Sequence, residues 1–338
     1  MNTRRARLQL IYENKDITQD LQQYLVGWTF TDNLSGQADD LQITLEDKGR
    51  RWMGRWMPEE GAVIRARIIR QNWEKEGKSD SLDLGQFEID EIEFSGPPST
   101  VQIKALSVPS SSALKGQRKN RAWEKTRLSV VAKDVARANR LSLFYDTDDD
   151  PEYDRVDQTE ETDLEFLSRM CNDAGLCLKI SDARIVIFDE QKYEQRPVIG
   201  TISRGDENVI QYSGRRTLTG VYRACRVVYH DEKKDRTIRH TFTPPNPPKT
   251  GRILVVNEQV ESIKQAERLA KKRLRERNRE GVTFSLSLTG NIRYLAGQTV
   301  QLAGFGSWDG KYIITQATHA QQNGYTTGLS LRKCLEGY

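Results

Sequence analysis

Alternation of apolar and polar residues dominates the first third of the chain. The segment "ARLQLIY" places Leu8, Leu10 and Tyr12 on one face of a strand, and "DLQITLED" follows the same rule. The segments "YLVGWTFTD", "GAVIRARIIR", "GQFEIDEIEFS" and "STVQIKALS" continue the pattern, and turn signals such as Gly-Pro-Pro separate them. Several short strands without a long helix predict a β-barrel or sandwich over residues 1–108.

Helical spacing replaces this alternation after about Pro109, where the polar connector "PSSSALKGQRKNRAWEK" begins. A second helix is expected to start after Thr162, which forms a capping box with Glu165, and to end at Gly175. The segments "LCLKI" and "RIVIF" around "SDAR" predict a hairpin, so residues 109–200 form a small α/β domain. The apolar stripes of the two helices are Leu128, Val131, Ala132, Val135 and Ala138, and Leu164, Leu167, Met170 and Cys171.

Strands return from about Ile202 and continue to the end of the chain. A hairpin is expected around the polar "EKKDR" turn, and a helical run follows at about residues 259–280. The closing segments "VTFSLSLTG", "GQTVQLAGF", "GKYIITQATH" and "GYTTGLSLRK" are typical of strands. Residues 201–338 are therefore predicted to form a second β-barrel domain that carries one helix, in an α+β, predominantly β protein.

The two β regions repeat one local plan. Gly61 and Gly297 each introduce a strand, and Gly85 and Gly310 each precede an aromatic residue and an isoleucine two positions apart. Gly310 is expected at a hairpin turn with a positive φ. His319 lies in the second copy and has no histidine counterpart in the first. Because a lone histidine lacks the positioned partners of acid–base catalysis, it is interpreted as structural or as an interface residue.

Composition limits the possible classes of protein. A chain of 338 residues is long for a single core and indicates two or three domains. The net charge of +4 does not by itself indicate a nucleic-acid-binding protein. The apolar content of 36% is low, which fits a protein that buries more surface when it assembles. The N-terminus has no signal-peptide pattern and no apolar run reaches membrane-spanning length, so folding in the cytoplasm is expected.

Candidate metal sites are weak in this sequence. Five residues separate Cys171 from Cys177 and no histidine lies nearby, so buried structural cysteines are favoured over zinc ligands. Cys225 and Cys334 complete no disulfide framework. In "DTDDDPEYDRVD" the aspartates have calcium-loop spacing, but the position that needs glycine is Pro151. We interpret this segment as a solvated acidic loop. Its candidate ligands are Asp146, Asp148, Asp150 and Asp157.

Motifs of nucleotide chemistry or hydrolysis are missing. "GFGSWDG" lies between strands rather than before a helix, so it predicts a hairpin turn and no phosphate cradle. No Walker lysine, GxSxG or HExxH pattern occurs. The helix from about Glu261 to Arg279 is basic, but no aromatic residues are interleaved, so a solvated or inter-subunit face is favoured over nucleic acid. Its narrow apolar stripe, which is expected to dock on the barrel, is Ile263, Ala266, Ala270 and Leu274.

Five segments together carry a family resemblance. They are "ADDLQITLEDKGRRWMGRWMPEEGAVI", "LGQFEIDEIEFSGPPSTVQIKALS", "RAWEKTRLSVVAKDVARANRLSL", "ETDLEFLSRMCNDAGLCLKI" and "WDGKYIITQATHAQQNGYTTGLSLR". The chain resembles the phage late control D family, the baseplate hub proteins of contractile phage tails and phage-tail-like bacteriocins. Related segments form the base of type VI secretion spike proteins.

This resemblance implies a structural hub and no enzyme, cofactor or metal. Two barrels similar to tail-tube protein would flank the α/β domain, and three copies would form a pseudo-sixfold ring between the sixfold tube and the threefold spike. The implied partners are other copies of the chain, a separate spike protein and a tube or tube-initiator protein. Tape measure and baseplate wedge proteins are further candidates, and DNA would at most pass through the channel. A peptidoglycan hydrolase and a nucleic-acid-binding protein remain the alternatives.

Overall fold

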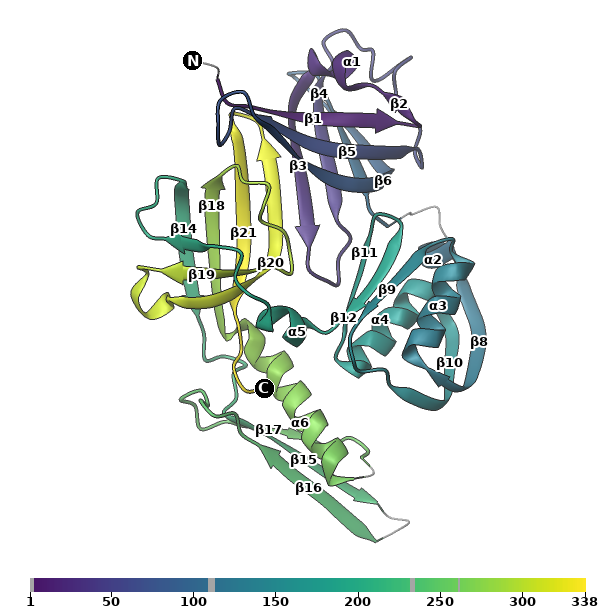
Figure 1. Cartoon of the computed structure of the whole chain (residues 1–338). Coiled ribbons are helices and arrows are strands. Elements are labelled where there is room, and N and C mark those ends of the chain that lie inside the picture. Colours follow the sequence, from purple (N-terminus) through teal and green to yellow (C-terminus); the bar gives the residue numbers. More distant parts are fainter. Residues whose placement is uncertain (1–2, 109–112, 232–234, 261) are drawn as a thin grey trace. The chain divides into compact units, whose positions relative to one another are not determined.

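The chain forms two compact units in the computed structural model, which describes residues 3–108, 113–231, 235–260 and 262–338 (Figure 1). The first unit comprises Met1–Tyr193, Ser287–Gly297 and Thr315–Leu329. The second comprises Glu194–Leu286, Gln298–Ile314 and Ser330–Tyr338. Both are rich in antiparallel strands, which confirms the predominantly β class.

The N-terminal strands form one antiparallel sheet in the order β3-β4-β7-β6-β5-β1-β2 (Figure 1). The predicted alternation holds, because Leu41, Ile43 and Leu45 are buried while Gln42 and Thr44 between them are partly exposed. Aromatic side chains such as Trp28, Phe30 and Phe87 complete the core. The elements are β1 (Arg5–Tyr12), β2 (Lys15–Asp16), α1 (Thr18–Gln22), β3 (Leu25–Asn33), β4 (Asp40–Glu46), β5 (Val63–Gln71), β6 (Ser79–Ser95) and β7 (Thr100–Leu106).

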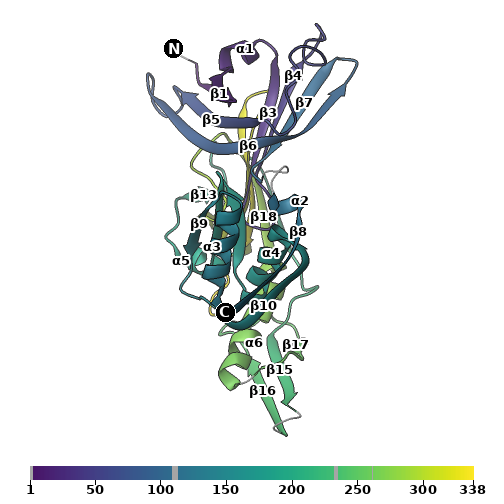
Figure 2. The same ribbon diagram turned by 90° about the vertical axis from the view of Figure 1, so that its right-hand side faces the viewer.

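The middle of the first unit has its own core, in which two helices pack against two small sheets (Figure 2). The capping box of Thr162 and Glu165 is present, and Gly175 ends the helix with φ +77°. The hairpin around "SDAR" is also confirmed. The elements are α2 (Ala113–Gly116), β8 (Arg118–Arg127), α3 (Leu128–Ala138), β9 (Ser142–Asp146), β10 (Glu152–Thr162), α4 (Asp163–Ala174), β11 (Cys177–Ser181), β12 (Arg184–Phe188) and α5 (Glu190–Gln195).

Three details of this middle segment differ from the sequence prediction. Much of the polar connector is strand β8, which pairs with β10, and Pro109 to Ser112 lie outside the described residues. The acidic segment becomes strand from Glu152 onward rather than a continuous loop. On the two helices, Ala136 and Phe166 are also buried, Ala138 is exposed, and Leu164 is partly buried against the core. The charged residues of β8 and β10 form strands because their pairing with each other outweighs their low strand propensity.

The second unit contains an inserted layer of helix and sheet that the sequence did not separate from the barrel. Its strands lie in the order β16-β15-β17, and α6 packs on β15 and β16. The hairpin of β15 and β16 is confirmed, although residues 232–234 of its turn lie outside the described part. The elements of the unit include β13 (Thr201–Ser203), β14 (Val209–Arg216), β15 (Ala224–Asp231), β16 (Arg236–Phe242), β17 (Ile253–Val256), α6 (Ile263–Asn278), β18 (Val282–Thr289), β19 (Thr299–Ala303), β20 (Gly310–Gln321) and β21 (Tyr325–Lys333).

Helix α6 therefore docks on this three-stranded sheet and not on a barrel. Ala266, Ala270 and Leu274 are fully buried against it, as the apolar stripe predicted. Ile263 is the exception, because 64% of its surface is exposed at the start of the helix. The preceding Ser262 accepts a hydrogen bond from the Gln265 N–H and caps the helix, while Glu261 lies outside the described residues.

The internal repeat extends to strand pairing. The pair β5–β6 and the pair β19–β20 are both antiparallel and have the same register relative to the turn glycines. Gly85 pairs with Ala66, and Gly310 pairs with the equivalent Leu302. Both glycines have a positive φ, +86° and +139° respectively, as expected for Gly310. The other equivalent pairs are Val63–Glu88 with Thr299–Ile313, and Ile64–Phe87 with Val300–Tyr312.

The strand order repeats as well. The order β3-β4-β7-β6-β5 in the first copy corresponds to β14-β18-β21-β20-β19 in the second. Among the described residues the pairings record no closure of either set into a complete barrel. The division into domains 1–108, 109–200 and 201–338 stays a prediction.

Candidate functional site

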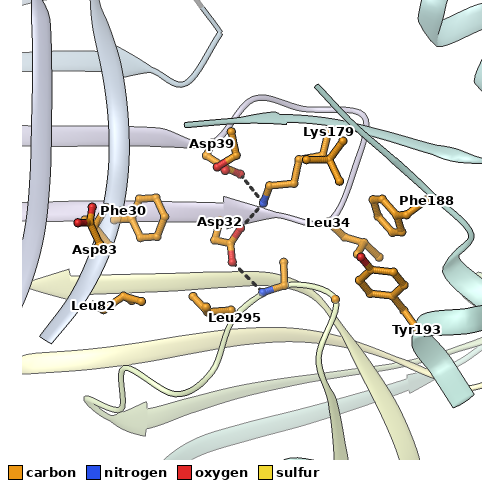
Figure 3. Close-up of a pocket in the computed structure, with 15 residues that line it drawn as sticks. Phe30, Asp32, Leu34, Asp39, Leu82, Asp83, Lys179, Phe188, Tyr193 and Leu295 are labelled. Carbon is orange, nitrogen blue, oxygen red and sulfur yellow. Dashed lines mark hydrogen bonds and ion pairs between the residues drawn. The ribbon is translucent and has the colours of Figure 1, made fainter. Parts of the chain in front are cut away.

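A pocket of about 280 Å³ is lined by the first sheet, the β11–β12 hairpin and the segment 295–297 (Figure 3). Phe30, Phe188 and Tyr193 supply aromatic walls. One side holds a charged cluster, in which Lys179 of β11 points toward Asp32 and Asp39 (Figure 3). This cluster contains the charged groups of the pocket that interact most closely with one another.

The Lys179 ammonium is fully engaged by the surrounding oxygen atoms. It donates to the Asp32 carboxylate and to the Asn33 carbonyl oxygen at 2.7 Å, and it lies 3.1 Å from the Asp39 carboxylate. Burial alone would lower the pKa of Lys179, but the charges of Asp32 and Asp39 raise it. Burial raises the pKa of Asp39 to about 6, although the Lys179 charge opposes this. A lysine held in its charged form in this way is a cross-link and not a nucleophile.

Backbone groups fix both carboxylates. The Asn33 N–H donates to Asp39 at 2.8 Å, and the Ala296 N–H donates to Asp32 at 2.8 Å. The end of β3, the start of β4, the hairpin strand β11 and the segment before β19 therefore meet at one ion cluster. The arrangement can hold two cores of the first unit together, and each of its three charged groups has a partner within the cluster.

Sequence reasoning missed this cluster. Asp32 and Lys179 are separated by 147 positions, and neither belongs to a local motif. Lys179 occupies an ordinary polar position of an alternating strand. No signal in a single sequence distinguishes it from a solvated lysine.

His319 is fully buried and has a partner on each ring nitrogen. Its Nδ1 lies 2.8 Å from the Tyr325 hydroxyl and its Nε2 lies 3.1 Å from the Tyr294 carbonyl oxygen. A carbonyl only accepts, so Nε2 carries the proton and Nδ1 accepts from Tyr325. Burial lowers the pKa of His319 to about 4. Its ring also lies nearly parallel to Phe30, with centroids 6.1 Å apart. These contacts give His319 a place in the core of the first unit.

The candidate calcium ligands point to separate donors. Asp146 accepts from the Lys192 ammonium at 2.8 Å, and Asp150 accepts from Ser129 at the start of α3 at 2.9 Å. Asp157 pairs with Arg155 through 3.1 Å bonds. In the described chain these three carboxylates therefore bind separate donors. Within the same residues, no group of three or more histidine, cysteine or acidic side chains is arranged to hold a metal.

The other candidates lie apart from the pocket cluster. Cys171 and Cys177 are buried thiols, and burial raises the pKa of Cys171 to about 12. Several basic residues of α6 pair within the second unit; Arg273, for example, lies 2.8 Å from Glu258. Of the helices described here, none is both long and apolar enough to cross a membrane.

Comparisons with known proteins agree on one family. The model of the phage tail baseplate hub (GPD) family matches residues 99–325. The probable baseplate hub protein of Escherichia phage 186 is 25% identical, over 95% of this chain and 91% of its own. The structure of a 43 kDa tail protein from prophage MuSo2 of Shewanella oneidensis has a TM-score of 0.74 at 14% identity, covering 98% and 99% of the two chains.

A more distant structural relative comes from a secretion machine. The Escherichia coli c3393 protein, described as a type VI secretion component with similarity to phage tail proteins, has a TM-score of 0.55 at 13% identity. It matches all of this chain and 78% of its own. The resemblance seen in the five sequence segments is thus confirmed, and the chain belongs to the phage tail baseplate hub family.

Proposed function

We propose that three copies of this hub form a closed ring whose six repeated β domains surround one channel. The ring would meet a sixfold tail tube on one side and a threefold spike on the other. Closed rotational symmetry suits the head-to-tail contacts that such a ring needs.

The repeated strand order is the observation that carries this proposal. In the second copy of the repeat, β20 pairs with β19 through Gly310–Ile313 and then with β3 through Gln316–Gln321. Strand β21 occupies the other edge of β20, so β19 and β3 share one edge. The last part of β20 is therefore the joint between the second repeat and the first.

The end of β6 is equivalent to the last part of β20, but within one chain no strand takes the place that β3 has beside β20, among the described residues. Strand β6 corresponds to β20 and pairs with β5 up to Glu88, after which Glu91–Ser95 pairs only with β7 among the described residues. Strand β14 corresponds to β3, and its side chains are largely exposed. Phe94 is 67% exposed and Ile210 is 57% exposed. We therefore propose that β14 of one copy lies beside the end of β6 in the next copy.

Cysteine cross-linking in assembled particles tests this joint. The double variant with Phe94→Cys and Tyr212→Cys is expected to form disulfides between copies and to give a ladder that ends at three chains. Each single variant is the control, because neither new thiol then has its partner. A ladder that reaches six chains, or no cross-link in intact particles, contradicts the ring.

The remaining partners follow from the ring. Spike and tube, or tube initiator, are proposed as separate proteins that bind its two faces, with tape measure and wedge proteins around them. The three-domain division is proposed as well, supported by separate cores in the first sheet and in the α3–α4 region. DNA would at most pass through the channel.

We also propose that the hub has no enzymatic activity. The support is that the candidate acid–base residue, His319, has protein partners on both nitrogens in the core. In a zymogram the purified protein is expected to leave peptidoglycan uncleared. Clearing that a single carboxylate substitution removes would instead favour the hydrolase.

A further inference from the structure

Strand β17 forms one edge of the small sheet in the second unit. The sheet order is β16-β15-β17, and α6 stands to one side of the three strands (Figure 2). Leu254 and Val256 pack into the core beneath the helix. Ile253 and Val255 alternate with them and are 39% and 56% exposed.

Half of the backbone groups of β17 face away from the sheet. Strand β17 pairs in parallel with β15, and the Arg223 N–H donates to the Arg252 carbonyl at 2.9 Å. In a parallel strand, successive residues form their backbone hydrogen bonds on opposite sides. Leu254 therefore forms its hydrogen bonds on the same side as Arg252, toward β15. Ile253 and Val255 therefore direct their N–H and C=O groups outward. In the described chain no strand pairs with β17 on that side.

The two edges of this sheet are protected differently. Edge strand β16 carries Arg236 and Arg239, and charged side chains of this kind discourage strand addition. Edge strand β17 reads "ILVV" and has no charge and no proline. An apolar, β-branched edge with free backbone groups is a template for another strand.

Charge defines the kind of strand that fits. Residues 222–281 contain sixteen lysines and arginines against eight aspartates and glutamates, whereas the whole chain has a net charge of only +4. Three exposed basic residues lie close to β17. Lys249 and Arg252 precede the strand in the sequence, and Arg223 precedes Ala224, the pairing partner of Ile253. We propose that β17 binds an extended segment of another tail protein, which adds as a strand and carries carboxylates beside apolar side chains.

Hydrogen exchange tests the strand addition directly. In the isolated protein the Ile253 and Val255 amides are expected to exchange at least ten times faster than those of Leu254 and Val256. In assembled particles all four amides are expected to be protected. Rapid exchange of Ile253 and Val255 in the particle would rule out an added strand.

A matched pair of variants tests the backbone contact. Val255→Pro removes the outward N–H and leaves the bonds to β15, because proline is tolerated on an edge strand. It is expected to reduce incorporation of the hub into particles by tenfold or more. Val255→Thr keeps the N–H and the β-branched shape and is expected to assemble normally. Equal assembly of both variants, with unchanged melting temperatures, contradicts the proposal.

Zero-length carbodiimide cross-linking of particles identifies the partner. Lys249 is expected to form an amide with an aspartate or glutamate of a different tail protein, and Lys249→Gln is expected to lose that adduct. An adduct with a second copy of this chain would assign the edge to the hub itself and overturn the proposed partner. Failure of the three-copy ring would leave these results unchanged, since none of them depends on β6 or β14.

Discussion

Gly290 shows how one residue limits the packing of the first unit. A Cβ atom at this position would lie 1.9 Å from the Cδ1 atom of the Tyr325 ring, and the Gly290 N–H donates to the Tyr325 carbonyl at 2.8 Å. Gly290→Ala must therefore displace the ring that also bonds His319, and should cost about 3 kcal/mol. The melting temperature measures this loss. Gly251→Ala, which meets nothing within 4 Å, is the control and should melt like the wild type.

His319 should make stability depend on pH at the same residue scale. Its pKa is about 4 in the folded protein, below the ordinary value of 6.5, so the unfolded chain binds more protons between these values. The stabilising contribution is complete above pH 6.5 and falls by about 3 kcal/mol as pH drops to 4. Unfolding free energies of the wild type and His319→Gln, compared across this range, should differ in slope.

At the scale of one element, the turn between β11 and β12 contains a strained backbone conformation that one substitution can relieve. Asp182 and Ala183 both have a positive φ, +50° and +53°, which corresponds to a hairpin turn of type I′. Alanine is disfavoured in this region and glycine is not. Ala183→Gly should raise the stability of the middle segment by about 0.5 kcal/mol. Thermal unfolding measures the gain, and a lower melting temperature would contradict the assigned turn.

At the scale of the whole molecule, Lys179 joins two cores of the first unit. Lys179→Met keeps the length of the side chain but leaves the carboxylates of Asp32 and Asp39 buried without their counter-ion. Breaking a buried pair on one side costs about 3–5 kcal/mol. Faster amide exchange is expected in β11 and in the 295–297 segment. The triple variant that adds Asp32→Asn and Asp39→Asn should regain part of the protection.

The hub is a component of a phage tail or tail-like particle, and two of its larger features can serve the proposed assembly. The repeat in strand order offers two equivalent joints, of which one lies within the chain and the other is proposed between copies. The basic inserted layer of α6 and β15–β17 adds a separate surface. The basic character of this layer could not be predicted from the net charge of the chain, because acidic residues elsewhere offset part of the positive excess of residues 222–281.

Local rules were enough for much of the fold. Alternation located strands of both β regions, the capping box and Gly175 bounded α4, and the glycines of the repeat marked the two equivalent hairpins. These features depend on residues within a few positions of one another, or on a period that a sequence displays directly. The family could be recognised for the same reason, since its segments keep their local patterns.

Tertiary structure decided the rest. Charged β8 and β10 are strands only because they pair with each other, and α6 lies on β15 and β16 rather than on a barrel. The Lys179 cluster joins residues 147 positions apart, and the partners of His319 come from Tyr294 and Tyr325. Contacts of this kind contribute energy only after the chain has folded back on itself. Local propensity carries no record of them, so the first sheet could be predicted while the ion cluster that anchors it could not.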